Sequence, residues 1–419
     1  MSEVNKEVVK KEAIKFDFVQ SALDPFNVLL DSMSMLKSAT KSDTSFDLLI
    51  TPVKEKGQPD RLLLEVIKGP AYGVVSIDQG ITVHEGANQP VLMSLQIFTS
   101  LPVSPVANKP IKFTITDRVY VTYPNDGSTQ DTKFDFEYSD KPETFTRTVA
   151  APLSIGFSNE IHSLIETYID SASNYVFKKR VDEPMSLINI SILKDNTFTI
   201  EATTGTEAFY AKTKINEIIR VEKDKKKHLD FSCMLYPSLW QAGFGLGTKY
   251  KTQVYLGYND TTITFASNNT AISHPRVNFK EFPKVAEMVG KWLEKPEVGS
   301  FTAAMNPSEF KKKLVYLESI GLQAKAQEPS FILSKKNDQP HIKLQGFISS
   351  GETKIIDKSI LSIEWKKEAQ IKLPAHLMNT VLTTAETHGL TKFFDLKDIP
   401  SVFISNELND CCILMSQEI

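Results

Sequence analysis

The chain has 419 residues, of which 41% are hydrophobic and 24% are charged. This balance is typical of globular proteins, and at about 150 residues per domain the length predicts roughly three domains. The net charge of −3 excludes a uniformly basic nucleic-acid-binding protein but is compatible with a local basic surface. No apolar run reaches the roughly 20 residues of a membrane helix, and the charged stretch MSEVNKEVVKKEAIKF has no signal-peptide core.

Cysteine and histidine usage argues against two common kinds of site. The three cysteines, two of them adjacent at Cys411 and Cys412, form neither a disulfide framework nor a zinc pattern. Seven scattered histidines show no metal-ligand spacing, and the chain has no nucleophile-elbow motif. We therefore expect no catalytic residue, no metal and no cofactor, and a reducing, cytoplasmic setting.

The first third of the chain predicts two helices, each followed by strands. Pro25 and Pro90 mark the helix starts, because proline is favoured in a first turn, where its missing N–H is not needed. Apolar residues at helical spacing follow from Phe26 to Leu36 and from Val91 to Phe98. Strands are predicted at residues 46–50, 61–67, 74–77, 81–85, 111–123 and 133–138.

The same order of elements recurs twice. Helices are predicted to start at Ser158, Pro237, Pro307 and Pro374, with Asn306 as an N-cap. Three copies of helix–strands–helix–strands predict an α+β fold with helices on antiparallel sheets. We place domains at residues 1–148, 149–297 and 298–419, and three unrelated α+β domains are the alternative. Further strands are predicted at residues 187–202, 228–234, 252–273, 330–334, 341–349, 354–363, 369–373 and 393–415.

The segment from Gly243 to Lys249, GFGLGTK, looks like a phosphate-binding loop but lacks the spacing of that motif. It also follows a predicted short helix, whereas a phosphate loop follows a strand. We interpret it as a turn.

The stretch from Pro184 to Ile215, PMSLINISILKDNTFTIEATTGTEAFYAKTKI, alternates apolar and polar residues on both sides of a Lys-Asp-Asn turn, which predicts a hairpin. It resembles the middle domain of the bacterial-type DNA sliding clamp, the β subunit of DNA polymerase III. In that family Ala-Thr-Asp-Gly-His-Arg stands where this chain has residues 202–207. Residues 262–285, with Phe282-Pro283, are similar to that domain's closing hairpin, and residues 412–419 to the family's last strand and tail. The first domain matches in the order of its elements more than in its residues.

The resemblance implies a divergent clamp, for which a phage or plasmid origin would account. Three clamp domains per chain, each with two helices packed on antiparallel sheets, would assemble as a head-to-tail homodimer ring with helices lining the hole. Such a ring encircles double-stranded DNA without sequence preference and makes or breaks no bond. It binds DNA polymerase and the clamp loader through short peptide motifs. The expected location is the nucleoid, or the host cytoplasm for a phage protein.

The resemblance also implies basic residues that face DNA phosphates at or just after the helices. For any single lysine, an ordinary solvated helix face is the alternative. Lys41 and Arg180 stand at positions that resemble the family's DNA-touching arginines. The full set of candidates is Lys37, Lys41, Lys178, Lys179, Arg180, Lys311, Lys312, Lys313 and Lys325.

A groove for partner peptides is implied between the middle and last domains. Apolar and methionine side chains suit an adaptable peptide groove, although an apolar last strand is equally typical of a core. The chain departs from the family here, with Thr206-Glu207 in place of His-Arg and Ser416-Gln417-Glu418 in place of Pro-Met-Arg, so a changed peptide preference is expected. The groove residues by position are Met185, Thr203, Gly205, Thr206, Glu207, Ala208, Pro283, Met288, Ile413 and Met415.

The ring interface is expected to join Phe134 and Phe136, on an edge strand of the first domain, to Ile320 of the last domain. The alternation of the two phenylalanines is equally typical of an inward sheet face. Two other classes of function stay open: an α+β interaction protein that closes no ring, and an enzyme whose site is dispersed in the sequence. A polar cleft with perturbed titratable groups would indicate the enzyme, and a dimer with a basic hole would indicate the clamp.

Overall fold

The computed structural model describes most of the chain and divides it into two compact units. Unit 1 comprises Met1–His162, Glu217–Lys223 and Ser238–Arg276, and unit 2 comprises Ser163–Asn216, Asp224–Pro237 and Val277–Ile419. The described residues are 13–36, 47–99, 109–124, 132–139, 141–178, 183–221, 230–277, 281–287, 289, 298–321, 330–336, 339–345, 350–354, 360–365, 370–397, 399–406 and 410–415.

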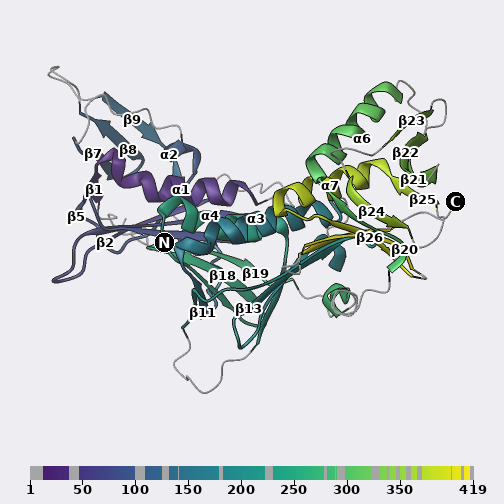
Figure 1. Ribbon diagram of the computed structural model, residues 1–419. Helices are drawn as coiled ribbons and strands as arrows, with labels where there is room; N and C mark the ends of the chain where they lie inside the picture. Colours follow the sequence, from purple (N-terminus) through teal and green to yellow (C-terminus); the bar gives the residue numbers. More distant parts are fainter. Residues whose placement is uncertain are drawn as a thin grey trace, which may run out of the picture. The chain divides into compact units, whose positions relative to one another are not determined.

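Unit 1 contains two antiparallel sheets and helices α1 (Asp24–Ser34), α2 (Gln96–Thr99) and α4 (Pro237–Tyr250) (Figure 1). One sheet has the order β5-β1-β7-β8-β9, and the other has the order β10-β6-β2-β3-β4-β19-β18-β17-β11-β15. The strands are β1 Ile14–Phe18, β2 Leu48–Val53, β3 Arg61–Lys68, β4 Ala71–Ile77, β5 Ile81–Glu85, β6 Val91–Met93, β7 Ile111–Ile115, β8 Val119–Tyr123, β9 Thr132–Phe136, β10 Tyr138–Ser139, β11 Leu153–Phe157, β15 Ile218–Arg220, β17 Val254–Tyr258, β18 Thr262–Ser267 and β19 Thr270–Pro275.

Unit 2 repeats this layering with helices α3 (His162–Ala172), α6 (Pro307–Gly321) and α7 (Ala375–His388), of which α6 and α7 pack side by side (Figure 1). Its sheets have the orders β16-β12-β13-β14-β28-β27-β26-β20-β24 and β23-β22-β21-β25. The strands are β12 Ile188–Ile192, β13 Thr197–Thr203, β14 Glu207–Lys214, β16 Phe231–Leu235, β20 Val298–Met305, β21 Ser330–Lys336, β22 Gln339–Gln345, β23 Ser350–Lys354, β24 Ile360–Trp365, β25 Gln370–Pro374, β26 Lys392–Leu396, β27 Ile399–Ser405 and β28 Cys411–Met415.

The described elements confirm the predicted α+β class and most of the predicted strands. Strands pair across both predicted domain boundaries, because β4 pairs with β19 and β14 pairs with β28. The three-domain division therefore stays a prediction. The predicted cap of α6 is present, since Asn306 Oδ1 accepts the N–H of Glu309 at 3.2 Å.

The helix predicted from Pro90 was wrong in its first half. Val91–Met93 form strand β6, which pairs with β2 on one side and β10 on the other, and α2 begins only at Gln96. All three strand residues are buried. Successive side chains of a strand point to opposite faces, so burial of three in a row means that both faces of β6 are covered, whereas a helix would bury only one side of this run.

The turn predicted at GFGLGTK was also wrong, because the segment lies inside helix α4. A Cβ on Gly243 would overlap the ring of Phe265, so only glycine lets the helix approach β18 this closely. Trp240 and Phe244 of the same helix pack against Phe265 and are fully buried. Glycine lowers the stability of a helix, and this packing offsets that loss. The packing partners lie elsewhere in the chain, so the local sequence does not reveal them.

Candidate functional site

The turn between β13 and β14 is rigidly held by its own hydrogen bonds. The Thr203 hydroxyl donates to the Glu207 carbonyl and accepts the N–H of Gly205, both at 2.9 Å. The N–H of Thr204 donates to the same carbonyl at 3.0 Å. Gly205 has φ +88°, where L-residues are strained, and its α-carbon faces the sulfur of Met185. The turn therefore presents a fixed backbone edge with Met185 beside it.

A second segment, residues 281–287, is fastened to the same strand. The N–H of Ala286 donates to Glu201 Oε2 at 2.8 Å, and Glu201 lies on β13. Val285 and Val289 are 2% and 0% exposed and anchor the segment by burial. Pro283 is half-buried. The structure thus holds the Pro283 segment against β13.

Strand β28 completes this group of elements. Residue Ile413 pairs with Ala208, and Leu414 pairs with Glu207. Met415 pairs with Ser401 of β27. Strand pairing therefore places the predicted last-strand residues beside the predicted turn residues. Of the remaining predicted groove residues, Thr206 is exposed, and Met288 lies outside the described part of the chain, as do Ser416 to Glu418.

Glu207 lies on the other face of the sheet from Ala208. Side chains alternate along a strand, and Phe209, two residues after Glu207, stacks with Tyr175 and packs against His388 of α7. Glu207 is therefore directed to the helix-facing side, where it is 6% exposed and its Oε2 has no hydrogen-bond partner among the described residues. Burial raises its pKa to about 7, and the nearby Lys178 charge partly opposes this.

The described basic candidates lie after α3 and on α6. Lys178 is exposed and follows the 3₁₀ turn Ser173–Tyr175. On α6, Lys311 pairs with Glu386 at 3.7 Å and Lys312 pairs with Glu309 at 2.8 Å. Lys313 is half-buried. The remaining candidates, Lys37, Lys41, Lys179, Arg180 and Lys325, lie outside the described residues.

The predicted interface residues of unit 1 lie on an edge strand. β9 is the last strand of its sheet and pairs with β8. Phe134 is 39% exposed and packs edge-on against Tyr123, whereas Phe136 is half-buried. Ile320 lies on α6 of unit 2, and its side chain is outside the described part.

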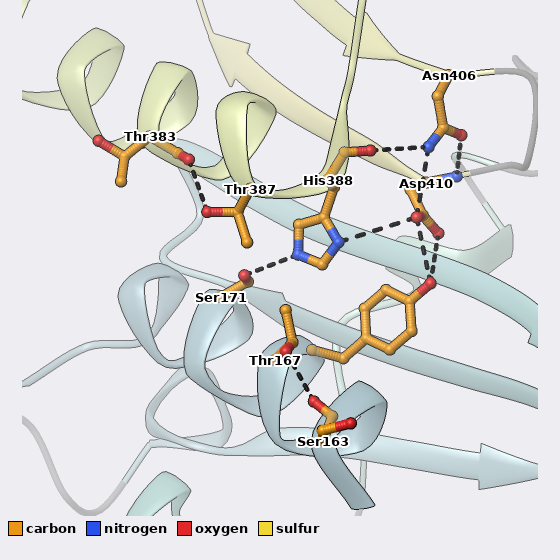
Figure 2. Close-up of polar contacts among 9 residues, drawn as sticks. Ser163, Thr167, Ser171, Thr383, Thr387, His388, Asn406 and Asp410 are labelled. Atoms are coloured by element: carbon orange, nitrogen blue, oxygen red, sulfur yellow. Dashed lines mark hydrogen bonds and ion pairs between the residues drawn. The ribbon is translucent and has the colours of Figure 1, made fainter. Parts of the chain in front are cut away.

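Sequence inspection missed a buried polar cluster between α3 and α7 (Figure 2). Ser171 Oγ lies 2.8 Å from His388 Nε2, and the Tyr168 hydroxyl donates to Asp410 at 3.2 Å. Asn406 Oδ1 accepts the Asp410 N–H at 3.0 Å. Burial lowers the pKa of His388 and raises that of Asp410, which favours their neutral forms.

This cluster has the residue types of a hydrolase triad but not its geometry. His388 Nδ1 is 4.0 Å from Asp410 Oδ2, too long for a hydrogen bond. Ser171 is 6% exposed, and the ring of Tyr168 stacks on His388 with centroids 5.0 Å apart. The Ser171 hydroxyl is thus largely covered, and its contact with His388 ties α3 to α7. Within the described part of the chain, no group of three His, Cys, Asp or Glu side chains could hold a metal ion.

Solved structures similar to this chain share one architecture. The DNA polymerase III beta chain of Streptococcus pneumoniae is 11% identical with a TM-score of 0.73, over 97% of this chain and 100% of that one. The DNA polymerase sliding clamp of Bacillus subtilis is 11% identical with a TM-score of 0.72, over 97% and 99%. The DNA polymerase III subunit beta of Pseudomonas aeruginosa is 15% identical with a TM-score of 0.69, over 97% and 100%.

The chain has the fold of a DNA sliding clamp. The predicted clamp fold is thereby confirmed, and the resemblance drawn from the hairpin residues holds at the level of architecture. No protein-family model matches the sequence, and no curated protein matches it significantly. Among its described residues, no helix is long and apolar enough to cross a membrane.

Proposed function

We propose that the chain is a sliding clamp, which encircles duplex DNA as a ring and tethers a DNA polymerase to it. The observation that carries this proposal is the likeness in fold to polymerase beta subunits over 97% of the chain, at a TM-score of 0.73. The function would be topological, so no bond is made or broken and no catalytic group is needed. The Ser171 cluster gives the alternative of an enzyme no support, because Ser171 is buried and the triad geometry is missing.

The proposed ring is a head-to-tail homodimer, in which β9 of one copy meets α6 of the next. An edge strand leaves backbone N–H and C=O groups open to pairing, and β9 adds the exposed ring of Phe134. On α6, Val315 and Tyr316 are 48% and 60% exposed. When two different surfaces meet head to tail, the copies form a closed ring only if the rotation from one copy to the next returns to the start, and otherwise they form a filament. A closed dimer is therefore what the clamp proposal requires.

DNA contact is proposed to be electrostatic and independent of sequence. Lys178, Lys311, Lys312 and Lys313 would face phosphates, together with the basic candidates outside the described residues. Helices α1 and α3 contain no Lys or Arg. The proposed contact is therefore concentrated on α6 and on the segments that follow α1 and α3, and it should weaken strongly with salt.

Partner peptides are proposed to bind at the outer face of the sheet of unit 2, beside the turn that follows Thr203. Met185 and Pro283, both half-buried, supply apolar surface beside a fixed backbone edge, and the buried Ala208 lies beneath it. Short peptides of DNA polymerase and of the clamp loader would bind there. Glu207 stands where the family has a basic residue, but its side chain faces the helices and not the proposed groove. The change of charge should therefore have little effect on which peptides bind.

The test is light scattering of the full chain, combined with retention on nicked circular DNA before and after linearisation. A dimer that stays on circles and slides off linear DNA is the expected result. A monomer that binds both forms equally would overturn the ring and favour a non-catalytic α+β interaction protein. A variant with Phe134→Ala and Tyr316→Ala should shift the mass toward the monomer and lose retention on circles.

A further inference from the structure

A charge-assisted hydrogen bond joins the Pro283 segment, residues 281–287, to the sheet. A helix begins at Val285, with residues 285–287 and 289 helical, and the first N–H groups of a helix have no partner within it. Glu201 supplies that partner from 85 residues earlier in the chain, through its Oε2 at 2.8 Å from the N–H of Ala286. A carboxylate at such a helix start is also favoured by the backbone dipoles.

The Glu201 carboxylate is itself locked in place. Its Oε1 accepts the side-chain N–H of Asn189 at 2.6 Å, and Asn189 Oδ1 accepts the hydroxyl of Ser232 at 3.1 Å. Glu201 is 7% exposed, so it has little freedom to move. Both carboxylate oxygens have partners, and these two bonds oppose the effect of burial on its pKa.

Glu201 lies on the face of the sheet where peptide binding is proposed. It is two residues before Thr203 on β13 and therefore points to the same face. Thr203 pairs with Ala208, and residues directly opposite each other in an antiparallel pair share a face. Glu201 thus connects the β13–β14 surface directly to the segment that carries Pro283.

We propose that Glu201 is a positioning residue of the peptide groove, whose carboxylate sets the distance between Pro283 and the β13–β14 surface. This inference rests on the proposed peptide-binding function. After loss of the bond, the burial of Val285 and Val289 still attaches the segment, so the segment stays folded but its N-terminal end moves. A groove of variable width binds a peptide more weakly, because part of the binding free energy is then used to fix the position of the Pro283 segment.

Hydrogen exchange of the free full-length chain tests the attachment without any peptide. In Glu201→Ala, amides of residues 281–287 should exchange about tenfold faster, as expected when one structural hydrogen bond is lost. Glu201→Gln keeps one carbonyl oxygen for the Ala286 N–H but loses the acceptor of the Asn189 amide, so it should restore part of the protection. The control Lys284→Ala removes an exposed ion pair with Glu287 and should leave exchange unchanged. Unchanged exchange in Glu201→Ala would overturn the proposal.

Peptide binding tests the effect on the groove. Fluorescein-labelled hexapeptides rich in Leu and Phe are screened on the wild-type chain, and the best binder is the probe. Its affinity should fall about tenfold in Glu201→Ala, recover in part in Glu201→Gln and stay within about twofold in Lys284→Ala. Faster exchange with unchanged affinity would overturn the positioning role. If no hexapeptide binds the wild-type chain, the groove itself is refuted, whereas the exchange result still decides whether Glu201 holds the segment.

Discussion

Each face of the β13–β14 hairpin carries one buried glutamate, and the two differ in their hydrogen-bond partners. Glu201 on the outer face has partners on both carboxylate oxygens, whereas Glu207 on the helix-facing side leaves Oε2 without a partner among the described residues. Burial raises the pKa of both groups, to about 7 for Glu207, whereas for Glu201 the bonds from Asn189 and Ala286 oppose the rise. Equal burial therefore does not mean equal cost, because hydrogen bonds to the charged form decide how much of the desolvation is recovered.

The largest effect should come from removing the satisfied glutamate. Glu201→Ala leaves the Asn189 amide and the Ala286 N–H without their acceptor, which should lower the free energy of unfolding of unit 2 by about 2–3 kcal/mol. Urea denaturation of the full chain at pH 7 measures this loss. A change below about 0.5 kcal/mol would show that water replaces both bonds and that the two faces do not differ.

Removing the unsatisfied glutamate should have the opposite sign. The folded pKa of Glu207, about 7, exceeds its ordinary value of 4.5. Both states are protonated below pH 4.5, and the folded state loses stability as the pH rises from there through 7. Glu207→Gln should therefore stabilise the chain by about 2 kcal/mol at pH 8 and by much less at pH 5. Unfolding midpoints at the two pH values test this, and equal shifts at both would contradict it.

The α3–α7 cluster offers a smaller test on the same helix-facing side. Ser171→Ala removes the hydroxyl partner of His388 and should cost about 1 kcal/mol of unfolding free energy, the usual net value of one hydrogen bond. Retention on circular DNA should stay at the wild-type level as long as the variant is folded, because the cluster is buried and structural. Abolished retention in a variant that remains folded would show instead that the cluster acts in DNA binding.

The smallest effect is expected at the surface of the Pro283 segment. Lys284 and Glu287 form an ion pair at 3.3 Å, with side chains 82% and 53% exposed. Such a pair contributes only about 0.3 kcal/mol. Lys284→Ala should therefore leave urea denaturation within about 0.5 kcal/mol of the wild-type chain. A loss as large as that of Glu201→Ala would mean that the segment depends on its surface charge as much as on Glu201.

Strong local patterns determined much of the architecture from the sequence alone. The isoleucines of β12 alternate with Asn189 and Ser191, and the structure buries Ile188, Ile190 and Ile192 on one face. The order of helices and strands repeats, so the α+β clamp fold could be inferred although the solved clamps are only 11–15% identical. Period and capping act over a few residues, and local sequence encodes them directly.

Tertiary structure alone decided how the candidate site is built. The bond between Glu201 and Ala286 spans 85 positions, and that between Ser171 and His388 spans 217. Strand pairing turned Val91–Met93 into a strand, and close packing on Phe265 kept glycine inside α4. The face to which Glu207 points follows from the register of β14, not from its place in a motif. Such contacts depend on the path of the whole chain, which no local window of the sequence contains.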